Sequence, residues 1–167
     1  HAVALAALAP HADRREPPVD PACGGNAFAH IAYARQLTLK GEIVADAFAR
    51  IAGVALDQPV RVTGSPERGF RMRARFHVHG SRAGFYREGT HDLCDAATSG
   101  QLQPAAAAAA QAVVDRLLAL GVSPHEIAGI ELAETVGADG RAVHVELRGP
   151  AAGLRFADPG SIEGLTG

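Results

Sequence analysis

The sequence predicts an α+β fold in which helices pack on one face of an antiparallel sheet. Three patterns predict it. Apolar and polar residues alternate over 70–79, a proline-initiated helical segment begins at Pro104, and a Gly-Ala-Asp-Gly turn joins two predicted strands at 127–134 and 142–148. With 167 residues, the chain is long enough to bury a core.

The N-terminal part is expected to hold an irregular segment, a helix and a short strand. Four prolines interrupt residues 1–22, which are therefore predicted to be irregular. A helix is predicted between residues 28 and 53, with Gly53 as its C-terminal stop. Its apolar residues recur at helical spacing: Ile43, Val44, Ala47, Phe48 and Ile51. A strand is predicted over 60–63.

The alternation over 70–79 predicts a half-buried strand, because successive side chains of a strand point to opposite faces. One side is apolar and carries Phe70, Met72, Ala74, Phe76 and Val78. The other side is basic and carries Arg71, Arg73, Arg75, His77 and His79. A row of guanidinium groups at strand spacing suits phosphate groups.

A turn at Gly80-Ser81 would place a return strand beside this one, with Phe76 opposite Phe85 on the buried face. The same register places Glu88 opposite Arg73, so that a cross-strand ion pair is a purely structural alternative for this arginine. One glutamate cannot neutralise three arginines, however.

The same register also places Tyr86 opposite Arg75 and Arg87 on the buried side opposite Ala74. Either Arg87 lies at a sheet edge and extends its side chain to solvent, or the turn has a different length.

The remaining elements follow from spacing. A short strand is expected over 90–94 and a helix from Pro104 to Gly121, with a core stripe of Val113, Val114, Leu117 and Leu118. In the last strand, Val143, Val145 and Leu147 should point inward. The predicted domains are an irregular segment at 1–22, one α+β domain at 23–148 and a linker at 149–167.

Charge is concentrated in the middle of the chain. Residues 61–87 contain seven arginines and one glutamate, a local charge of +6, whereas the whole chain carries −2. This balance argues against nonspecific coating of nucleic acid but allows a focused basic patch. The phosphate-binding candidates are Arg71, Arg73 and Arg75, with Lys40 and Arg87 as weaker ones.

The two cysteines, Cys23 and Cys94, allow a disulfide, metal binding or no role at all. Two free thiols in a cytoplasmic protein are the default expectation. Neither cysteine has a second one at metal-ligand spacing, so no metal site is predicted. No apolar run approaches the roughly 20 residues needed to span a bilayer.

Several segments together resemble the S-adenosylmethionine-dependent RNA uracil-C5 methyltransferases, which act on ribosomal or transfer RNA. The similar segments lie between residues 13 and 104. They include Cys23-Gly24-Gly25, His30-Ile31-Ala32-Tyr33, Gly64-Ser65-Pro66-Glu67, the strand from Phe70 to Phe76, and Gly84-Phe85-Tyr86-Arg87-Glu88-Gly89.

The resemblance implies that this chain corresponds to the central, RNA-contacting domain of such an enzyme. The family's cysteine nucleophile in its Ser-Cys-Asn-Pro context is missing here, and so is a glycine-rich S-adenosylmethionine loop. No catalytic, cofactor-binding or metal-binding residue is therefore assigned. S-adenosylmethionine is expected in a domain outside this chain.

Many members of that family hold a four-iron cluster. The matching positions here are near Val19 and at Cys23, Asn26 and Ser99, so that only one cysteine is kept. One thiolate cannot hold a cluster that needs about four ligands. An iron–sulfur cluster is therefore not expected.

Three hypotheses remain. The first is the RNA-contacting part of an RNA uracil-C5 methyltransferase in the cytoplasm. The second is a stand-alone RNA-binding or interaction module without methyl transfer. The third is a structural α+β domain whose arginines form a solvated face.

Overall fold

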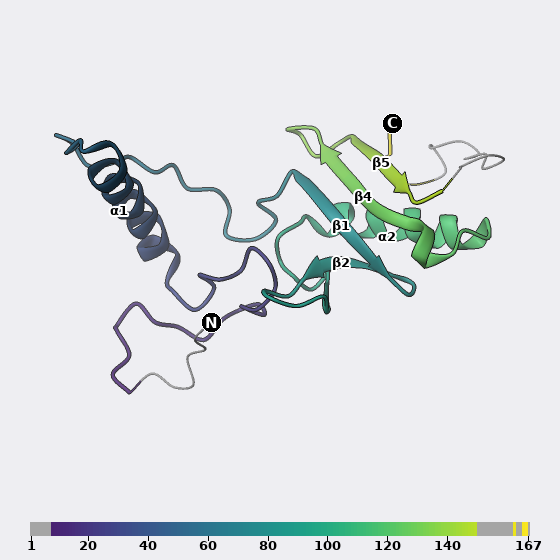
Figure 1. Ribbon diagram of the computed structural model, residues 1–167, viewed down its shortest axis with the longest axis horizontal. Helices are drawn as coiled ribbons and strands as arrows, with labels where there is room; N and C mark the ends of the chain where they lie inside the picture. Colours follow the sequence, from purple (N-terminus) through teal and green to yellow (C-terminus); the bar gives the residue numbers. More distant parts are fainter. Residues whose placement is uncertain (1–7, 150–161, 163–164, 167) are drawn as a thin grey trace. The chain divides into compact units, whose positions relative to one another are not determined.

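The computed structural model describes residues 8–149, 162 and 165–166 (Figure 1). Their elements are, in chain order, α1 (Tyr33–Ala52), β1 (Arg73–His79), β2 (Arg82–Tyr86), β3 (Leu93–Asp95), α2 (Pro104–Ala119), a 3₁₀ turn (Pro124–Glu126), β4 (Ile127–Glu134) and β5 (Arg141–Leu147). The chain divides into two compact units, one holding α1 and the other holding the sheet and α2.

The first unit comprises His1–Pro21 and Ala27–Ser65. Its helix α1 begins at Tyr33, later than the predicted residue 28, and ends at Ala52. As predicted, Gly53 stops the helix: it adopts a left-handed φ of 67° and donates its N–H to the Phe48 carbonyl. The predicted strand over 60–63 is wrong. This segment instead crosses α1 at Gly41, where an added Cβ would lie 3.0 Å from the Val60 carbonyl oxygen.

The second unit comprises Ala22–Asn26 and Pro66–Gly167, and its described strands form one antiparallel sheet in the order β3-β2-β1-β4-β5. Strand β1 divides its length between two neighbours. Its first half pairs with β4, from Arg73 to Phe76, and its second half pairs with β2 across the predicted Gly80-Ser81 turn. This division determines which side chains meet on the sheet.

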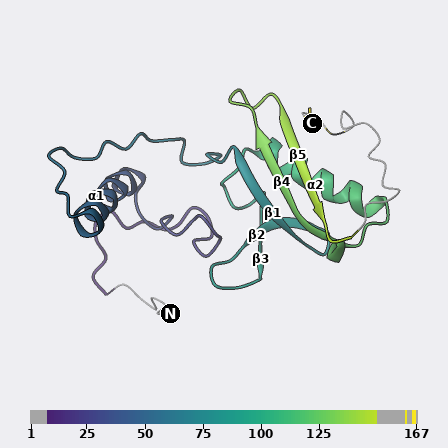
Figure 2. The ribbon, with the colours of Figure 1, turned by 45° about the horizontal axis from the view of Figure 1, so that its top comes forward.

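Helix α2 lies along one face of this sheet and packs on β2 and β4 (Figure 2). The α+β prediction is confirmed for this unit. Val113, Val114 and Leu117 are buried as predicted, and so are four members of the alanine run, Ala106, Ala107, Ala109 and Ala110. Methyl groups at these positions let the helix backbone come close to the sheet.

The last hairpin matches its prediction closely. The bounds of β4 are the predicted ones, and β5 begins and ends one residue earlier than expected. The three residues of β5 that were expected to point inward pack against the core, as predicted: Val143, Val145 and Leu147. Thr166 donates its backbone N–H to the Arg141 carbonyl, while most of the linker predicted at 149–167 lies outside the described residues.

The start of the basic strand was predicted too early. Phe70 and Met72 were expected on the buried face, but they are 40% and 41% exposed. The ladder begins only at Arg73, so strand alternation does not govern the residues before it. Neither described helix has the apolar length needed to cross a membrane.

Candidate nucleic-acid interface

The face of the sheet opposite α2, which we call the open face, carries two rows of polar positions. Arg73, Ala133 and Ala142 are cross-strand neighbours in one row, from β1 through β4 to β5. Two positions further along β1, Arg75 and Glu131 are directly opposite each other, and His144 continues that row on β5. The open face is thus built from three strands that are far apart in sequence.

Arg75 is neutralised on this face by two carboxylates. Its Nη1 lies 2.8 Å from an oxygen of Glu131, and its Nη2 bonds Glu146 on β5. These hydrogen bonds, with that to Glu146 the larger cause, raise the pKa of Arg75 above its usual value. The side chain crosses Gly129, where an added Cβ would lie 3.2 Å from Nε, so glycine leaves room for this arrangement.

Arg73 is exposed and makes no ion pair with any described residue. The predicted pair with Glu88 is wrong. Strand β2 ends at Tyr86, and the position across from Arg73 is occupied by Ala133 of β4. Glu88 instead donates its backbone N–H to the Ala22 carbonyl. Arg73 therefore presents, on the open face, a guanidinium that has no ion-pair partner among the described residues.

Arg71 lies outside the row that was predicted for it. It precedes β1, and its guanidinium carbon is 5.1 Å from the ring centre of Phe85, a buried core residue. Its backbone N–H donates to the Gln101 carbonyl. A cation over an aromatic ring is stabilised by the ring quadrupole, so Arg71 has a packing role.

The two weaker candidates lie elsewhere. Arg87 was expected opposite Ala74, but Ala74 pairs with Leu132, and Arg87 forms an antiparallel bridge with Cys23. The predicted two-residue turn at Gly80-Ser81 is correct, but strand β2 ends at Tyr86, before it reaches Arg87. Lys40 is exposed on α1 in the other unit. Of the five predicted contacts, only Arg73 and Arg75 share the open face of β1.

An aromatic cluster at the β1–β2 end of the open face was missed by the sequence reasoning. The rings of His77 and Tyr86 stack with centroids 3.8 Å apart, and His91 meets Tyr86 edge-on at 5.4 Å. Burial first, and then the charges of Arg75 and His91, lower the pKa of His77. The stacking of His77 on Tyr86 could have been predicted from the register of the hairpin, because that register places Tyr86 diagonally across from His77.

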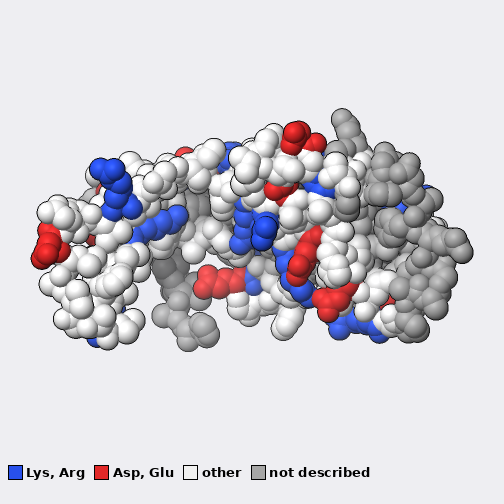
Figure 3. All heavy atoms as spheres, turned by 90° about the horizontal axis from the view of Figure 1, so that it is seen from above, with Lys and Arg blue, Asp and Glu red and all other residues white. Residues whose placement is uncertain are grey.

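Charge is mixed over the sheet unit on the side that Figure 3 displays, where basic and acidic atoms lie next to one another. This agrees with the ion pairs of Arg75, which place two glutamates among the basic residues of β1. The local charge of +6 over 61–87 therefore does not create one continuous basic surface there.

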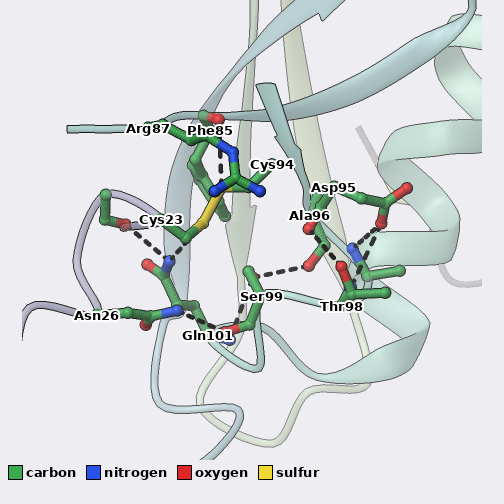
Figure 4. The surroundings of a disulfide bond; sticks show 12 residues. Cys23, Asn26, Phe85, Arg87, Cys94, Asp95, Ala96, Thr98, Ser99 and Gln101 are labelled. Carbon is green, nitrogen blue, oxygen red and sulfur yellow. Dashed lines mark hydrogen bonds between the residues drawn. A yellow bond between two sulfur atoms is a disulfide. The ribbon is translucent and has the colours of Figure 1, made fainter. Parts of the chain in front are cut away.

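Cys23 and Cys94 form a disulfide, which corrects the expectation of two free thiols (Figure 4). Their Cα atoms are 5.8 Å apart, and the two residues are 1% and 6% exposed. The bond joins segment 22–26 to β3. Backbone hydrogen bonds support the same contact, since Gly24 donates to the Tyr86 carbonyl over 3.1 Å.

Polar side chains surround this disulfide (Figure 4). Asn26 Nδ2 donates to the Ser99 carbonyl over 2.9 Å, and Gln101 Nε2 donates to the Gly24 carbonyl over 2.7 Å. Three of the four matched cluster positions, Cys23, Asn26 and Ser99, thus lie together and are buried, while Val19, near the fourth, is half-buried. Their side chains are a disulfide sulfur, an amide and a hydroxyl.

Among the described residues, no group of three His, Cys, Asp or Glu side chains is arranged to hold a metal ion. The oxygen Oε1 of Gln101 is buried and has no hydrogen-bond partner among the described residues. Thiolate sulfur is the usual ligand of an iron–sulfur cluster, and both cysteine sulfurs are already consumed in the disulfide.

Two relatives come from Bacillus cereus, and both are named as uncharacterized RNA methyltransferases. The protein from strain ATCC 14579 is 37% identical over 90 residues, which cover 50% of this chain and 19% of the relative. This chain is similar to part of an RNA methyltransferase. The protein from strain ATCC 10987 is 30% identical over 115 residues, covering 65% of this chain and 25% of the relative. No protein-family model matches the chain.

Proposed function

We propose that this chain is the RNA-contacting portion of an RNA uracil-C5 methyltransferase that modifies ribosomal or transfer RNA. The similarity to two RNA methyltransferases supports the class, and the resemblance of the segments between residues 13 and 104 supports the uracil-C5 type. The observation that carries the proposal is the exposed guanidinium of Arg73 on an open sheet face, which has no ion-pair partner among the described residues.

Arg73 is the principal contact in this proposal, because its guanidinium is free to bind a phosphate through two parallel hydrogen bonds. Arg75 shares the strand face, but its two carboxylate partners compete with a phosphate for the same donors. Arg71, Arg87 and Lys40 are further candidates outside this face. These contacts position RNA without reading its sequence.

The methyl donor, S-adenosylmethionine, is expected to bind a part of the enzyme outside this chain. The sequence has no glycine-rich loop after a strand, and neither cysteine lies in the context expected for the nucleophile. The expected compartment is the cytoplasm. A disulfide is uncommon in that compartment, so the redox state of Cys23 and Cys94 in cells tests this expectation directly.

RNA binding is tested by titrating a fluorescent RNA hairpin with the wild-type chain and with the Arg71→Ala/Arg73→Ala/Arg75→Ala variant at several salt concentrations. We expect weaker binding by the variant, and a slope of log affinity against log salt that falls by about one unit or less for each phosphate that the variant no longer binds. Arg116→Ala is the matched control, since Arg116 is exposed on α2. Superimposable curves for all three proteins would refute the RNA contact.

A second assay separates the enzyme hypothesis from the stand-alone RNA-binding module. The chain is mixed with RNA and S-adenosylmethionine, and transfer of a labelled methyl group is followed. We expect RNA binding without transfer, and transfer to uridine C5 once the remainder of the parent protein is present. A parent protein that binds RNA but never transfers a methyl group would favour the stand-alone module.

A further inference from the structure

The open face contains an open hollow of about 430 Å³ on the β1–β4–β5 half of the sheet. Its lining includes Arg73, Glu131, Ala133, Ala142 and His144. All of these residues belong to the sheet unit and come from three neighbouring strands. The hollow is therefore a feature of the sheet itself.

Two alanines explain why the surface is hollow at this place. Ala133 and Ala142 are directly opposite each other on β4 and β5, and Arg73 continues their row on β1. Ala133 and Ala142 project only methyl groups from the sheet, and these methyl groups form the floor of the hollow. The long side chain of Arg73 forms one of its sides. The span from β1 to β5 is two strand spacings, about 10 Å.

An anionic occupant is favoured at one point of the hollow, the guanidinium of Arg73, whereas the formal charges of Arg73, Arg75, Glu131 and Glu146 together cancel. Glu131 lines it, but the Glu131 carboxylate is bonded to Arg75, and Glu146 is held by the same guanidinium. Arg73 and His144 make no ion pair with any described residue. The free donors at the hollow are thus a guanidinium and an imidazole, and its carboxylate is already engaged.

We propose that this hollow is a subsite for one nucleotide of a single-stranded RNA segment. Arg73 binds the phosphodiester, the ribose rests on the methyl groups of Ala133 and Ala142, and His144 donates a hydrogen bond to a sugar or phosphate oxygen. An imidazole has an N–H donor in either protonation state. This inference rests on the proposed function, because it names the segment of RNA that the open face receives.

A single strand fits this surface better than a duplex does. A nucleotide that is free of base pairing can place its phosphate at Arg73 and its sugar in the hollow at the same time, because no partner strand fixes its backbone. A duplex presents its phosphates on a stiff convex surface. The low alanine floor offers such a surface no contact.

The test fills the hollow without changing any charge. Ala142 is exposed, so Ala142→Leu is expected to fold, and Ala133→Leu is a second filling variant. Ala119→Leu adds the same side chain at an exposed position of α2 and is the matched control. Arg73→Ala removes the cation instead. Binding of a ten-nucleotide single-stranded RNA and of an RNA duplex is measured by fluorescence anisotropy, with circular dichroism as the folding check.

We expect Arg73→Ala to weaken single-strand binding at least about tenfold, as loss of one charge-assisted hydrogen bond does. Both filling variants should weaken it as well, because leucine occupies the space proposed for the ribose. Only Arg73→Ala should also lower the salt slope. Adenosine monophosphate should compete poorly, whereas strong competition would assign the hollow to a free nucleotide and overturn the inference.

The inference would also be overturned if the filling variants bound single-stranded RNA as well as Ala119→Leu does. It would be overturned, too, if the duplex bound as tightly as the single strand and lost as much affinity in the same variants. If the filling variants bind normally while the triple arginine variant still weakens RNA binding, the hollow alone is refuted. If no arginine variant changes binding, the proposed function falls as well.

Discussion

Arg73 and Arg75 lie two residues apart on one strand face, yet their surroundings give them different roles. Arg75 holds Glu131 and Glu146, whereas Arg73 has no ion-pair partner among the described residues. The two carboxylates would otherwise repel a phosphate from this face. Arg75 therefore acts on RNA binding chiefly by offsetting part of the negative charge of these two carboxylates.

This role predicts a rescue. Arg75→Ala is expected to weaken RNA binding, because it leaves two unpaired carboxylates beside the hollow. Adding Glu131→Gln and Glu146→Gln should restore most of the affinity, while folding stability stays nearly unchanged, since exposed ion pairs contribute little. Fluorescence anisotropy and urea titration measure the two quantities. A triple variant as weak as Arg75→Ala would mean that Arg75 touches the phosphate itself.

His77 predicts a pH dependence of stability. Its folded pKa is lowered, so the unfolded chain takes up a proton more readily as the pH falls. The stabilising contribution is fully present above the unfolded pKa, about 6.5, and is lost as the pH falls below it toward the folded pKa. Urea titrations at pH 7.5 and 5.0 should therefore show a smaller loss of stability for His77→Phe than for wild type. His79→Gln, an exposed neighbour, should behave like wild type.

At the scale of elements, α2 shows how a plain sequence takes on a packing role. Its alanine run predicts a helix by propensity alone. Once the helix packs on the sheet, some alanines of the run are buried and others are exposed. Ala110 is completely buried, whereas Ala108 faces solvent. The small side chains set the distance between helix and sheet, so these alanines are not interchangeable.

Enlarging the two alanines separates packing from propensity. Ala110→Leu should lower the free energy of unfolding by about 1–3 kcal/mol, because a tightly packed core has no room for three more carbon atoms. Ala108→Leu, with the same change in helix propensity, should leave it within about 0.5 kcal/mol. Urea denaturation followed by circular dichroism measures both. Equal losses would show that the helix does not pack closely on the sheet at Ala110.

At the scale of the whole molecule, the disulfide lies within the sheet unit and joins its early segment, Ala22–Asn26, to strand β3. Cys23 lies between two stretches of the α1 unit, but it is bonded to Cys94, 71 positions later. Closing so long a loop restricts the unfolded chain far more than it restricts the folded one. The bond thus favours the arrangement in which segment 22–26 lies against the sheet.

Replacing both cysteines by serine is expected to lower the free energy of unfolding by about 2–5 kcal/mol. A denaturant titration of the wild-type protein in the presence of a reductant should show a similar loss in the free energy of unfolding. The stability of the double variant should not change when the reductant is added. Thiol titration of the protein in denaturant, purified without reductant, should detect no free thiol. Two free thiols per chain would contradict the disulfide.

The sequence by itself determined the elements that depend on local periodicity and turn chemistry. The bounds of β4, the Gly80-Ser81 turn, the end of α1 at Gly53 and the core stripe of α2 all follow from spacing within one segment. The predicted basic face of β1 also survives from Arg73 onward. Each of these features needs only near neighbours along the chain.

The tertiary structure alone decided which segments meet. Half of β1 pairs with β4, more than 50 residues later, so Glu131 and Glu146 rather than Glu88 lie beside its arginines. The hollow and the disulfide likewise join residues that no periodicity connects. The physical reason is that strand pairing is set by the competition of all available edges for hydrogen bonds and burial, whereas a local pattern specifies only which side of a strand is apolar.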